Sequence, residues 1–139
     1  MSMYPEDLVA PMREDLTSVG FNELHTAEEV DQLMNKKEGT VLMVVNSVCG
    51  CAAAMARPGV KLALQSEKKP DFLATVFAGM EKEAVEKARA YMAPFPPSSP
   101  SIALFKDGNL VHMIDRHHIE GRPAEMISEN LQTAFEEYC

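Results

Sequence analysis

The sequence has few positive charges and no long apolar segment. Thirteen lysines and arginines stand against 21 aspartates and glutamates, which gives a formal net charge of −8. Such a charge repels phosphate backbones and anionic lipids, and it disfavours nucleic-acid and membrane-surface partners. No apolar run approaches the ~18 residues of a membrane span, and the charged N-terminal residues contain no apolar signal core. We therefore expect a cytoplasmic protein that binds neither nucleic acid nor membrane.

Cysteine is also scarce, because the chain has only Cys49, Cys51 and Cys139. So small and odd a number argues against a secreted disulfide scaffold. In a reducing cytoplasm, two neighbouring cysteines more often serve redox chemistry or metal binding than a structural bridge. Cys139 is the last residue, where chains commonly fray, and we interpret it as incidental. The question of function is therefore mostly a question about Cys49-Gly50-Cys51.

The length of 139 residues and the 46% hydrophobic content predict a single domain over residues 1–139. The run at 40–47 is apolar at consecutive positions, which is typical of a strand covered on both faces. Asp107-Gly108 is the strongest short hairpin signal, and a βαβ unit before it predicts a mixed sheet. The expected elements are helices at 5–17 and 26–39, a strand at 40–47, a helix at 52–65 interrupted at 57–59, a strand at 72–77, a helix at 81–92, an irregular proline-rich stretch at 93–100, strands at 101–106 and 109–114, and a helix at 124–138.

The position of the cysteine pair predicts different roles for its two thiols. A cysteine at the start of a helix faces unpaired backbone N–H groups and the positive end of the helix dipole. Both favour the thiolate and lower the pKa from its ordinary value of ~8.5. Cys49 has this position, whereas Cys51 lies further into the helix and closer to the core. The sequence therefore predicts Cys49 as the nucleophile and Cys51 as the resolving thiol.

The single residue between the cysteines restricts a disulfide between them. On a regular helix, side chains two positions apart point about 200° apart, and on a strand their Cα atoms are ~6.5–7 Å apart, at the limit of disulfide geometry. We therefore expect Gly50 to form a bent turn through backbone angles that other residues avoid. Closing the bridge should then store strain, and a strained disulfide is more oxidising than a relaxed one.

Two segments of the chain resemble thioredoxin-like proteins. Asn-Ser-Val-Cys-Gly-Cys-Ala-Ala at 46–53, followed by Ala-Arg-Pro at 56–58, resembles the bacilliredoxin family. Pro-Ser-Ile-Ala-Leu-Phe-Lys-Asp-Gly at 100–108 is similar to the thioredoxin segment of cis-proline, strand and hairpin, although thioredoxins have two residues between their cysteines. The resemblance covers essentially the whole chain. It implies a three-layer α/β/α sandwich with a mixed four-stranded sheet and two extra N-terminal helices, and it implies that Pro100 is a cis-proline beside the site.

The resemblance also implies an enzyme, a thiol–disulfide oxidoreductase. Its partners would be oxidised or S-bacillithiolated client proteins, with bacillithiol as thiol co-substrate and with no cofactor or metal. Cys49 would attack the mixed disulfide, and Cys51 or a second bacillithiol would release the adduct. Arg57 would either assist a carboxylate-bearing thiol or be a solvated residue on a helix surface. A protein disulfide isomerase and a non-catalytic redox-sensing or metal-binding module remain alternatives.

Less specific interpretations of these residues also stay open. The cysteines could be two small core residues, and Pro100 could be a trans-proline that opens a strand. A zinc site would need four ligands, and no spacing joins any histidine to the cysteine pair. Residues 117–118, with the polar residues that follow them, are typical of a loop. The histidines that could supplement the two thiols are His25, His112, His117 and His118.

Overall fold

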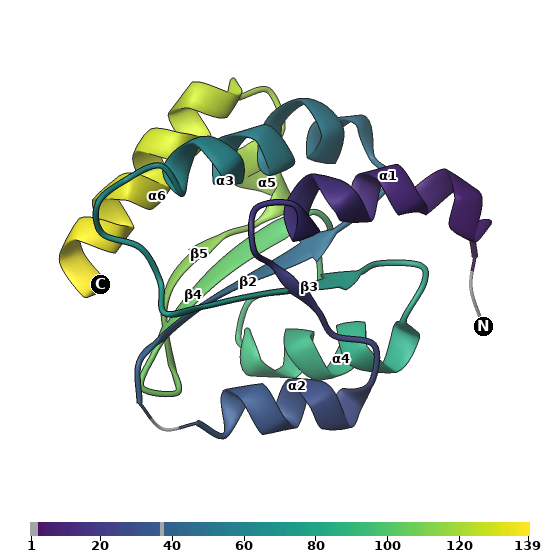
Figure 1. The fold of residues 1–139 in the computed structure, drawn as a ribbon, viewed down its shortest axis with the longest axis horizontal. Helices are drawn as coiled ribbons and strands as arrows, with labels where there is room; N and C mark the ends of the chain where they lie inside the picture. Colours follow the sequence, from purple (N-terminus) through teal and green to yellow (C-terminus); the bar gives the residue numbers. More distant parts are fainter. Residues whose placement is uncertain (1–2, 37) are drawn as a thin grey trace.

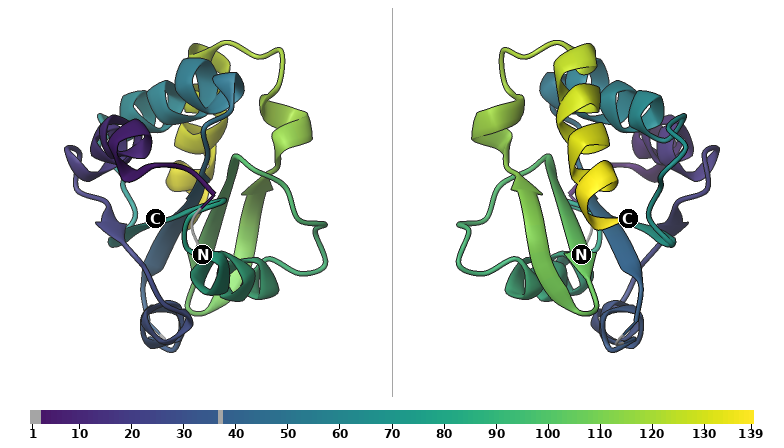
Figure 2. Two further views of the ribbon diagram at one scale, coloured as in Figure 1. Left: turned by 90° about the vertical axis from the view of Figure 1, so that its right-hand side faces the viewer. Right: turned by 90° about the vertical axis from the view of Figure 1, so that its left-hand side faces the viewer.

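A five-stranded sheet lies between two layers of helices in the computed structural model, which describes residues 3–36 and 38–139 (Figure 1). One face of the sheet is covered by α1, α3, α5 and α6, and the other by α2 and α4 (Figure 2). This arrangement confirms the predicted three-layer α/β/α sandwich. The elements are α1 (Glu6–Thr17), β1 (Asn22–Glu23), α2 (Ala27–Met34), β2 (Thr40–Asn46), the π-helical turn η1 (Ala52–Ala56), α3 (Arg57–Ala63), β3 (Phe72–Phe77), α4 (Lys82–Tyr91), β4 (Ser101–Lys106), β5 (Asn109–Ile114), α5 (Arg116–Ile119) and α6 (Ala124–Tyr138).

The sheet is mixed and has the strand order β1-β3-β2-β4-β5. β2 and β3 are parallel and are joined by the helical segment η1–α3, whereas β4 is antiparallel to both β2 and β5. The β4–β5 hairpin turns at Asp107 and Gly108, whose φ angles are 50° and 83°. Two successive positive φ angles are what a tight hairpin turn needs, so the Asp-Gly signal is confirmed.

The apolar run of β2 is buried because the strand is central in the sheet. Leu42 and Val44 point into the cluster under α3 and α6. Val41, Met43 and Val45 point into the cluster formed with α2 and α4. Alternate side chains of one strand thus fill both cores, which explains why the sequence does not alternate there.

Four of the predicted elements differ in the structure. The helical segment after Cys49 is not interrupted at 57–59, because α3 begins at Arg57 and the irregular part is the π-helical turn η1 before it. The sheet has five strands instead of four, because the two residues of β1 pair in parallel with β3, and so short a polar strand has no hydrophobic pattern. The capping box at Thr26 is confirmed, but α2 ends at Met34 and not near Gly39. Residues 117–118 belong to the short helix α5 and not to a loop, because Asp115 caps that helix by accepting a hydrogen bond from the His118 N–H.

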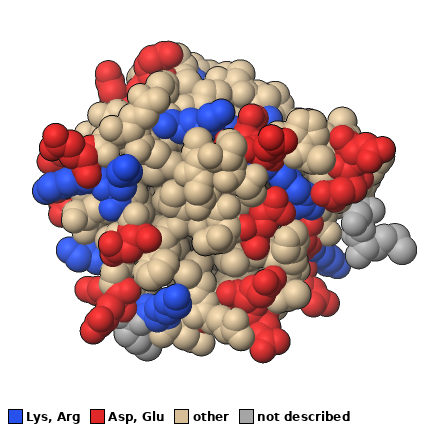
Figure 3. Space-filling model, in the orientation of Figure 1, with Lys and Arg blue, Asp and Glu red and all other residues tan. Residues whose placement is uncertain are grey.

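Charged side chains of both signs are interspersed on the face drawn in Figure 3. Basic groups there are separated by acidic and uncharged surface, so this face has no continuous basic area. Within the part of the chain that the structure describes, none of the helices is both long enough and apolar enough to cross a bilayer.

Candidate active site

Cys49 lies at the turn between β2 and the helical segment that begins at the next residue. Its carbonyl accepts hydrogen bonds from the N–H groups of Ala52 and Ala53, at 3.0 and 3.2 Å. Its Sγ accepts a hydrogen bond from the Cys51 N–H at 3.4 Å. These are the contacts of a helix N-cap residue, with sulfur in place of the usual side-chain oxygen. The structure therefore has Cys49 at a helix start, as the sequence predicts.

The two thiols of the pair are in contact but differ in exposure. Both cysteines are free, and their Sγ atoms are 2.6 Å apart. Cys51 is 8% exposed and packs into the core cluster under α3 and α6, whereas Cys49 is partly exposed. Cys49 also lines a groove on the surface, and Cys51 does not. An incoming disulfide therefore reaches Cys49 first.

The surroundings shift the pKa values of the two thiols in opposite directions. The hydrogen bond from the Cys51 thiol lowers the pKa of Cys49, and the Cys51 N–H, the Arg116 charge and the Ala52 N–H lower it further against a smaller effect of burial. Burial raises the pKa of Cys51, and a negatively charged Cys49 sulfur beside it adds to this rise. The thiolate of the pair is therefore favoured on Cys49.

Gly50 has an ordinary backbone conformation in this structure, whereas the unusual backbone angles are expected for the closed Cys49–Cys51 bridge. It is the first residue of the helical segment and is absent from the five glycines with positive φ. A Cβ atom added to it would meet nothing within 4 Å. In this structure, with both thiols free, the cysteine turn therefore needs no glycine-specific backbone angle.

Arg57 is a buried support of the cysteine turn, so neither predicted role for it holds. Its side chain is 4% exposed. Nη1 donates to Asn46 Oδ1 and to the Ser47 carbonyl at 2.9 and 3.0 Å, and Nε donates to Asp15 at 3.1 Å. The Ser47 hydroxyl in turn accepts the Cys49 N–H at 3.1 Å. Arg57 thus fixes the residues that lead into Cys49 and offers no surface to a substrate.

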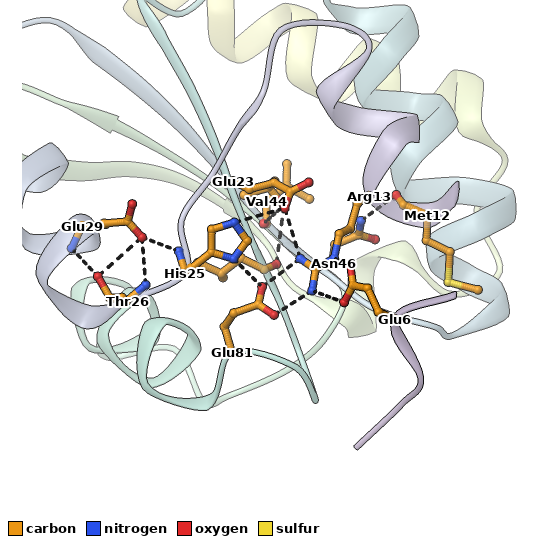
Figure 4. A network of polar contacts seen from close by, with 12 residues as sticks. Glu6, Met12, Arg13, Glu23, His25, Thr26, Glu29, Val44, Asn46 and Glu81 are labelled. Carbon is orange, nitrogen blue, oxygen red and sulfur yellow. Dashed lines mark hydrogen bonds and ion pairs between the residues drawn. The ribbon is translucent and has the colours of Figure 1, made fainter. Parts of the chain in front are cut away.

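Helix α1, outside the βαβ core, also contacts the end of β2 that leads into this turn. The Asn46 side chain donates to the Met12 carbonyl at 3.0 Å. Arg13 reaches both oxygens of Glu81 at 2.9 and 2.7 Å and Glu6 at 2.9 Å, and Figure 4 shows how these side chains converge. Because Glu81 precedes α4, this network connects α1 to the opposite layer of helices. The end of β2 is therefore held by hydrogen bonds with both α1 and α3.

The loop before β4 lies beside Cys49. The Ser99–Pro100 peptide bond is cis, and Pro100 itself is buried. Ser99 lines a groove of about 330 Å³ together with Cys49. The pairing of Val45 with Ser101 brings the end of β2 beside the start of β4, so the sequence-predicted site residues Cys49, Gly50, Cys51 and Pro100 lie at the same end of these two strands. The groove is completed by Met3, Tyr4, Ser47, Val48, Ala78, Gly79 and Arg116.

Arg116, which the sequence did not single out, lies in the wall of this groove. It begins α5, its backbone N–H donates to the Ser98 hydroxyl at 3.2 Å, and its Nη1 donates to the Ser99 carbonyl at 3.4 Å. Its Nε pairs with Glu120 one turn later. A signal for it existed in the hairpin: β5 runs back beside β4, and the pairing of Ile102 with Ile114 places the residues after β5 opposite Pro100.

The histidines do not join the cysteine pair. None of them lines the groove of Cys49. Among the described residues, no three His, Cys, Asp or Glu side chains are grouped so that they could hold a metal ion. His25 lies near Glu23 and Glu81, at 3.3 and 3.8 Å, and His118 contacts Asp115 at 2.9 Å. In the described structure, no histidine is therefore placed to supplement the two thiols as a metal ligand.

Comparisons with known proteins agree with this chemistry. A family model described as Disulphide isomerase matches residues 4–139. A bacilliredoxin of Cytophaga hutchinsonii is 60% identical over 135 residues, which cover 97% of this chain and 99% of that protein. A bacilliredoxin of Halalkalibacterium halodurans is 55% identical over 143 residues, which cover 100% of this chain and 99% of that protein.

Solved structures of thioredoxins share the fold. The thioredoxin of Fasciola hepatica superposes with a TM-score of 0.59 at 19% identity, over 86% of this chain and 100% of that protein. The thioredoxin of Trypanosoma brucei brucei gives a TM-score of 0.56 at 18% identity, over 84% of this chain and 92% of that protein. The predicted thioredoxin-like fold is thereby confirmed.

Proposed function

This chain belongs to the bacilliredoxin family and is a thiol–disulfide oxidoreductase, and from that premise we propose that it removes bacillithiol from S-bacillithiolated proteins. The observation that carries the proposal is the difference between the two thiols. Cys49 lines an open groove and has a lowered pKa, while Cys51 touches it from the buried side and has a raised pKa. The removal of a small thiol needs a thiolate that attacks the mixed disulfide, here Cys49, and a second thiol that later resolves the adduct, here Cys51.

The first step transfers the small thiol from the client to Cys49. The Cys49 thiolate attacks the bacillithiol sulfur of the mixed disulfide. A disulfide forms between Cys49 and bacillithiol, the client–bacillithiol bond breaks, and the electron pair leaves on the client sulfur. The client recovers its thiol, and oxidation passes to Cys49 with no change in the total number of disulfides.

The second step regenerates the enzyme by one of two routes. Cys51 can lose its proton and attack Cys49, which releases bacillithiol as a thiolate and leaves a Cys49–Cys51 disulfide that external thiols must reduce. A second bacillithiol thiolate can instead attack the bound bacillithiol sulfur, which frees Cys49 and forms a bacillithiol disulfide. Both routes balance with thiols alone, so we propose bacillithiol as co-substrate, no further cofactor, and a reducing cytoplasm as the compartment.

Variants of the three cysteines test the proposal. With no free bacillithiol present, we expect Cys51→Ala to restore the activity of a bacillithiolated client once and to keep one bacillithiol on Cys49, as detected by mass spectrometry. Cys49→Ala should do neither. Cys139→Ala is the matched control, because Cys139 is exposed at the end of α6, and it should turn over like the unmodified chain. If Cys49→Ala restores the client at the unmodified rate, the mechanism is wrong.

Protein disulfide isomerase activity is the second candidate, favoured by the description of the family model that matches this chain. An isomerase would form a mixed disulfide between Cys49 and the client instead of the small thiol. Refolding of a protein with scrambled disulfides distinguishes the two. A chain that ignores bacillithiolated clients but reshuffles protein disulfides is an isomerase, and the main proposal then fails.

A further inference from the structure

Among the described residues, the groove beside Cys49 has one basic side chain and no acidic one. Of its nine described lining residues, Arg116 is the cation, Cys49 carries the reactive thiol, and the other seven have uncharged side chains. The volume of about 330 Å³ is at the small end of ligand pockets and suits a small molecule better than a protein surface. A lone cation beside the exposed thiol is notable in a protein with a formal net charge of −8.

The Arg116 side chain is held in place but keeps free donors. It is 45% exposed. Nε pairs with Glu120, and Nη1 donates to the Ser99 carbonyl at 3.4 Å. Nη2 has no hydrogen-bond partner within residues 3–36 and 38–139. A guanidinium presents a planar fork of N–H donors that matches a carboxylate. Arg116 can therefore bind an anionic group in the groove and keep its contacts to Glu120 and the Ser99 carbonyl.

We propose that Arg116 binds the carboxylate of a small thiol in the groove and thereby decides which sulfur of a mixed disulfide Cys49 attacks. The inference rests on the proposed function, because it concerns the small-thiol half of the same substrate. Arg57, the other arginine near the turn, is buried against Asn46 and Ser47 and cannot take this role. Arg116 is a specificity residue here, since the bonds that break and form belong to Cys49 and the disulfide.

The choice of sulfur has a chemical consequence. Attack on the small-thiol sulfur forms a bond between Cys49 and the small thiol and expels the client thiolate, which repairs the client. Attack on the client sulfur forms a bond between Cys49 and the client and expels the small thiolate, which leaves the client trapped. An anionic group held by Arg116 keeps the small-thiol sulfur in the groove next to Cys49 and favours the first outcome.

The test measures these two adducts directly. The full chain with Cys51→Ala and Cys139→Ala keeps every adduct on Cys49. It is mixed with a single-cysteine client whose mixed disulfide carries either mercaptosuccinate, which has carboxylates, or 2-mercaptoethanol, which has none. After a short reaction and acid quench, mass spectrometry gives the ratio of small-thiol adduct to client adduct on Cys49.

We expect Arg116→Gln to lower this ratio about fivefold with mercaptosuccinate, the size of a partly exposed ion pair, and to leave it unchanged with 2-mercaptoethanol. Arg116→Lys keeps the charge and should recover part of the loss. Glu120→Gln removes the competing carboxylate and should raise the mercaptosuccinate ratio. Arg122→Gln is the matched control, because Arg122 lines a different cavity and donates to the His118 carbonyl, and it should change nothing.

Two failures of this experiment have different meanings. An equal effect of Arg116→Gln on both probes, or no effect on either, overturns the assignment of Arg116 while small-thiol adducts on Cys49 still support the proposed function. If the parent variant with Arg116 intact forms no bacillithiol adduct from a bacillithiolated client, the proposed function fails. The ratio of small-thiol adduct to client adduct with mercaptosuccinate then still decides whether Arg116 binds a carboxylate.

Discussion

Replacing Arg57 by methionine should destabilise the protein and loosen the cysteine turn. Methionine fills a similar volume but cannot hydrogen-bond to the Ser47 carbonyl, for which Arg57 is the hydrogen-bond donor in the described structure. A buried carbonyl left unpaired costs about 1–3 kcal/mol. The Asn46 oxygen loses one of its two donors but keeps the Ser47 N–H at 2.9 Å. The lost pair with Asp15, which is 45% exposed, adds little.

Methionine also avoids the cost of burying a guanidinium, which offsets part of this loss. We therefore expect the free energy of unfolding to fall by about 2 kcal/mol. For a chain of this length, that corresponds to a fall of about 7 °C in Tm. Thermal unfolding of the reduced protein, followed by circular dichroism, measures it. Client turnover should fall as well, because Ser47 positions the Cys49 N–H.

Lys61→Met is the matched control for this prediction. Lys61 is 41% exposed and approaches the same Asp15 carboxylate at 3.9 Å, without any contact to the cysteine turn. It should change the free energy of unfolding by less than about 0.5 kcal/mol. Equal Tm values for Arg57→Met and Lys61→Met would refute the argument that Arg57 satisfies the turn.

Three further predictions follow from the site. Because the pKa of Cys49 is lowered and that of Cys51 is raised, alkylation by iodoacetamide at increasing pH should modify Cys49 first, and the reverse order would reverse the assigned roles. Gly50→Ala should keep or slightly raise the stability of the reduced protein, whereas Gly59→Ala should lower it by about 1–3 kcal/mol, because its Cβ would lie 2.7 Å from Ile127 Cγ2; denaturant titration compares them. EDTA should leave turnover unchanged, since the described residues offer no three-ligand cluster, and a loss restored by zinc would contradict this.

The sequence predicted the sheet well where hydrophobic runs end at turn signals. The strand expected at 72–77 and the hairpin around Asp107-Gly108 are found at the predicted residues. The place of Cys49 could also be predicted, because it depends only on a strand followed by a helix. β1 could not, because its pairing with β3 comes from tertiary packing and leaves no pattern in two polar residues.

The environments of the two arginines near the site could not be predicted from the sequence. Arg57 and Arg116 are the same residue type in the sequence, but Arg57 is buried under the cysteine turn and Arg116 lies in the wall of the groove. Burial of Arg57 depends on Asp15 in α1 and on Asn46 at the end of β2, which only the folded chain brings together. Local sequence contains no information about such partners.

Arg116 cannot be the cause of the difference between the two thiols. Its positive charge lowers the pKa of Cys49 and also that of Cys51. The opposite pKa shifts come from burial and from the direction of the hydrogen bonds. Cys51 is buried, whereas the Cys49 sulfur accepts hydrogen bonds from the Cys51 thiol and from backbone N–H groups. Removing Arg116 should therefore raise both pKa values and leave Cys49 the more reactive thiol. A change in which sulfur Cys49 attacks, without a change in which cysteine attacks, is thus a signature of ligand recognition by Arg116.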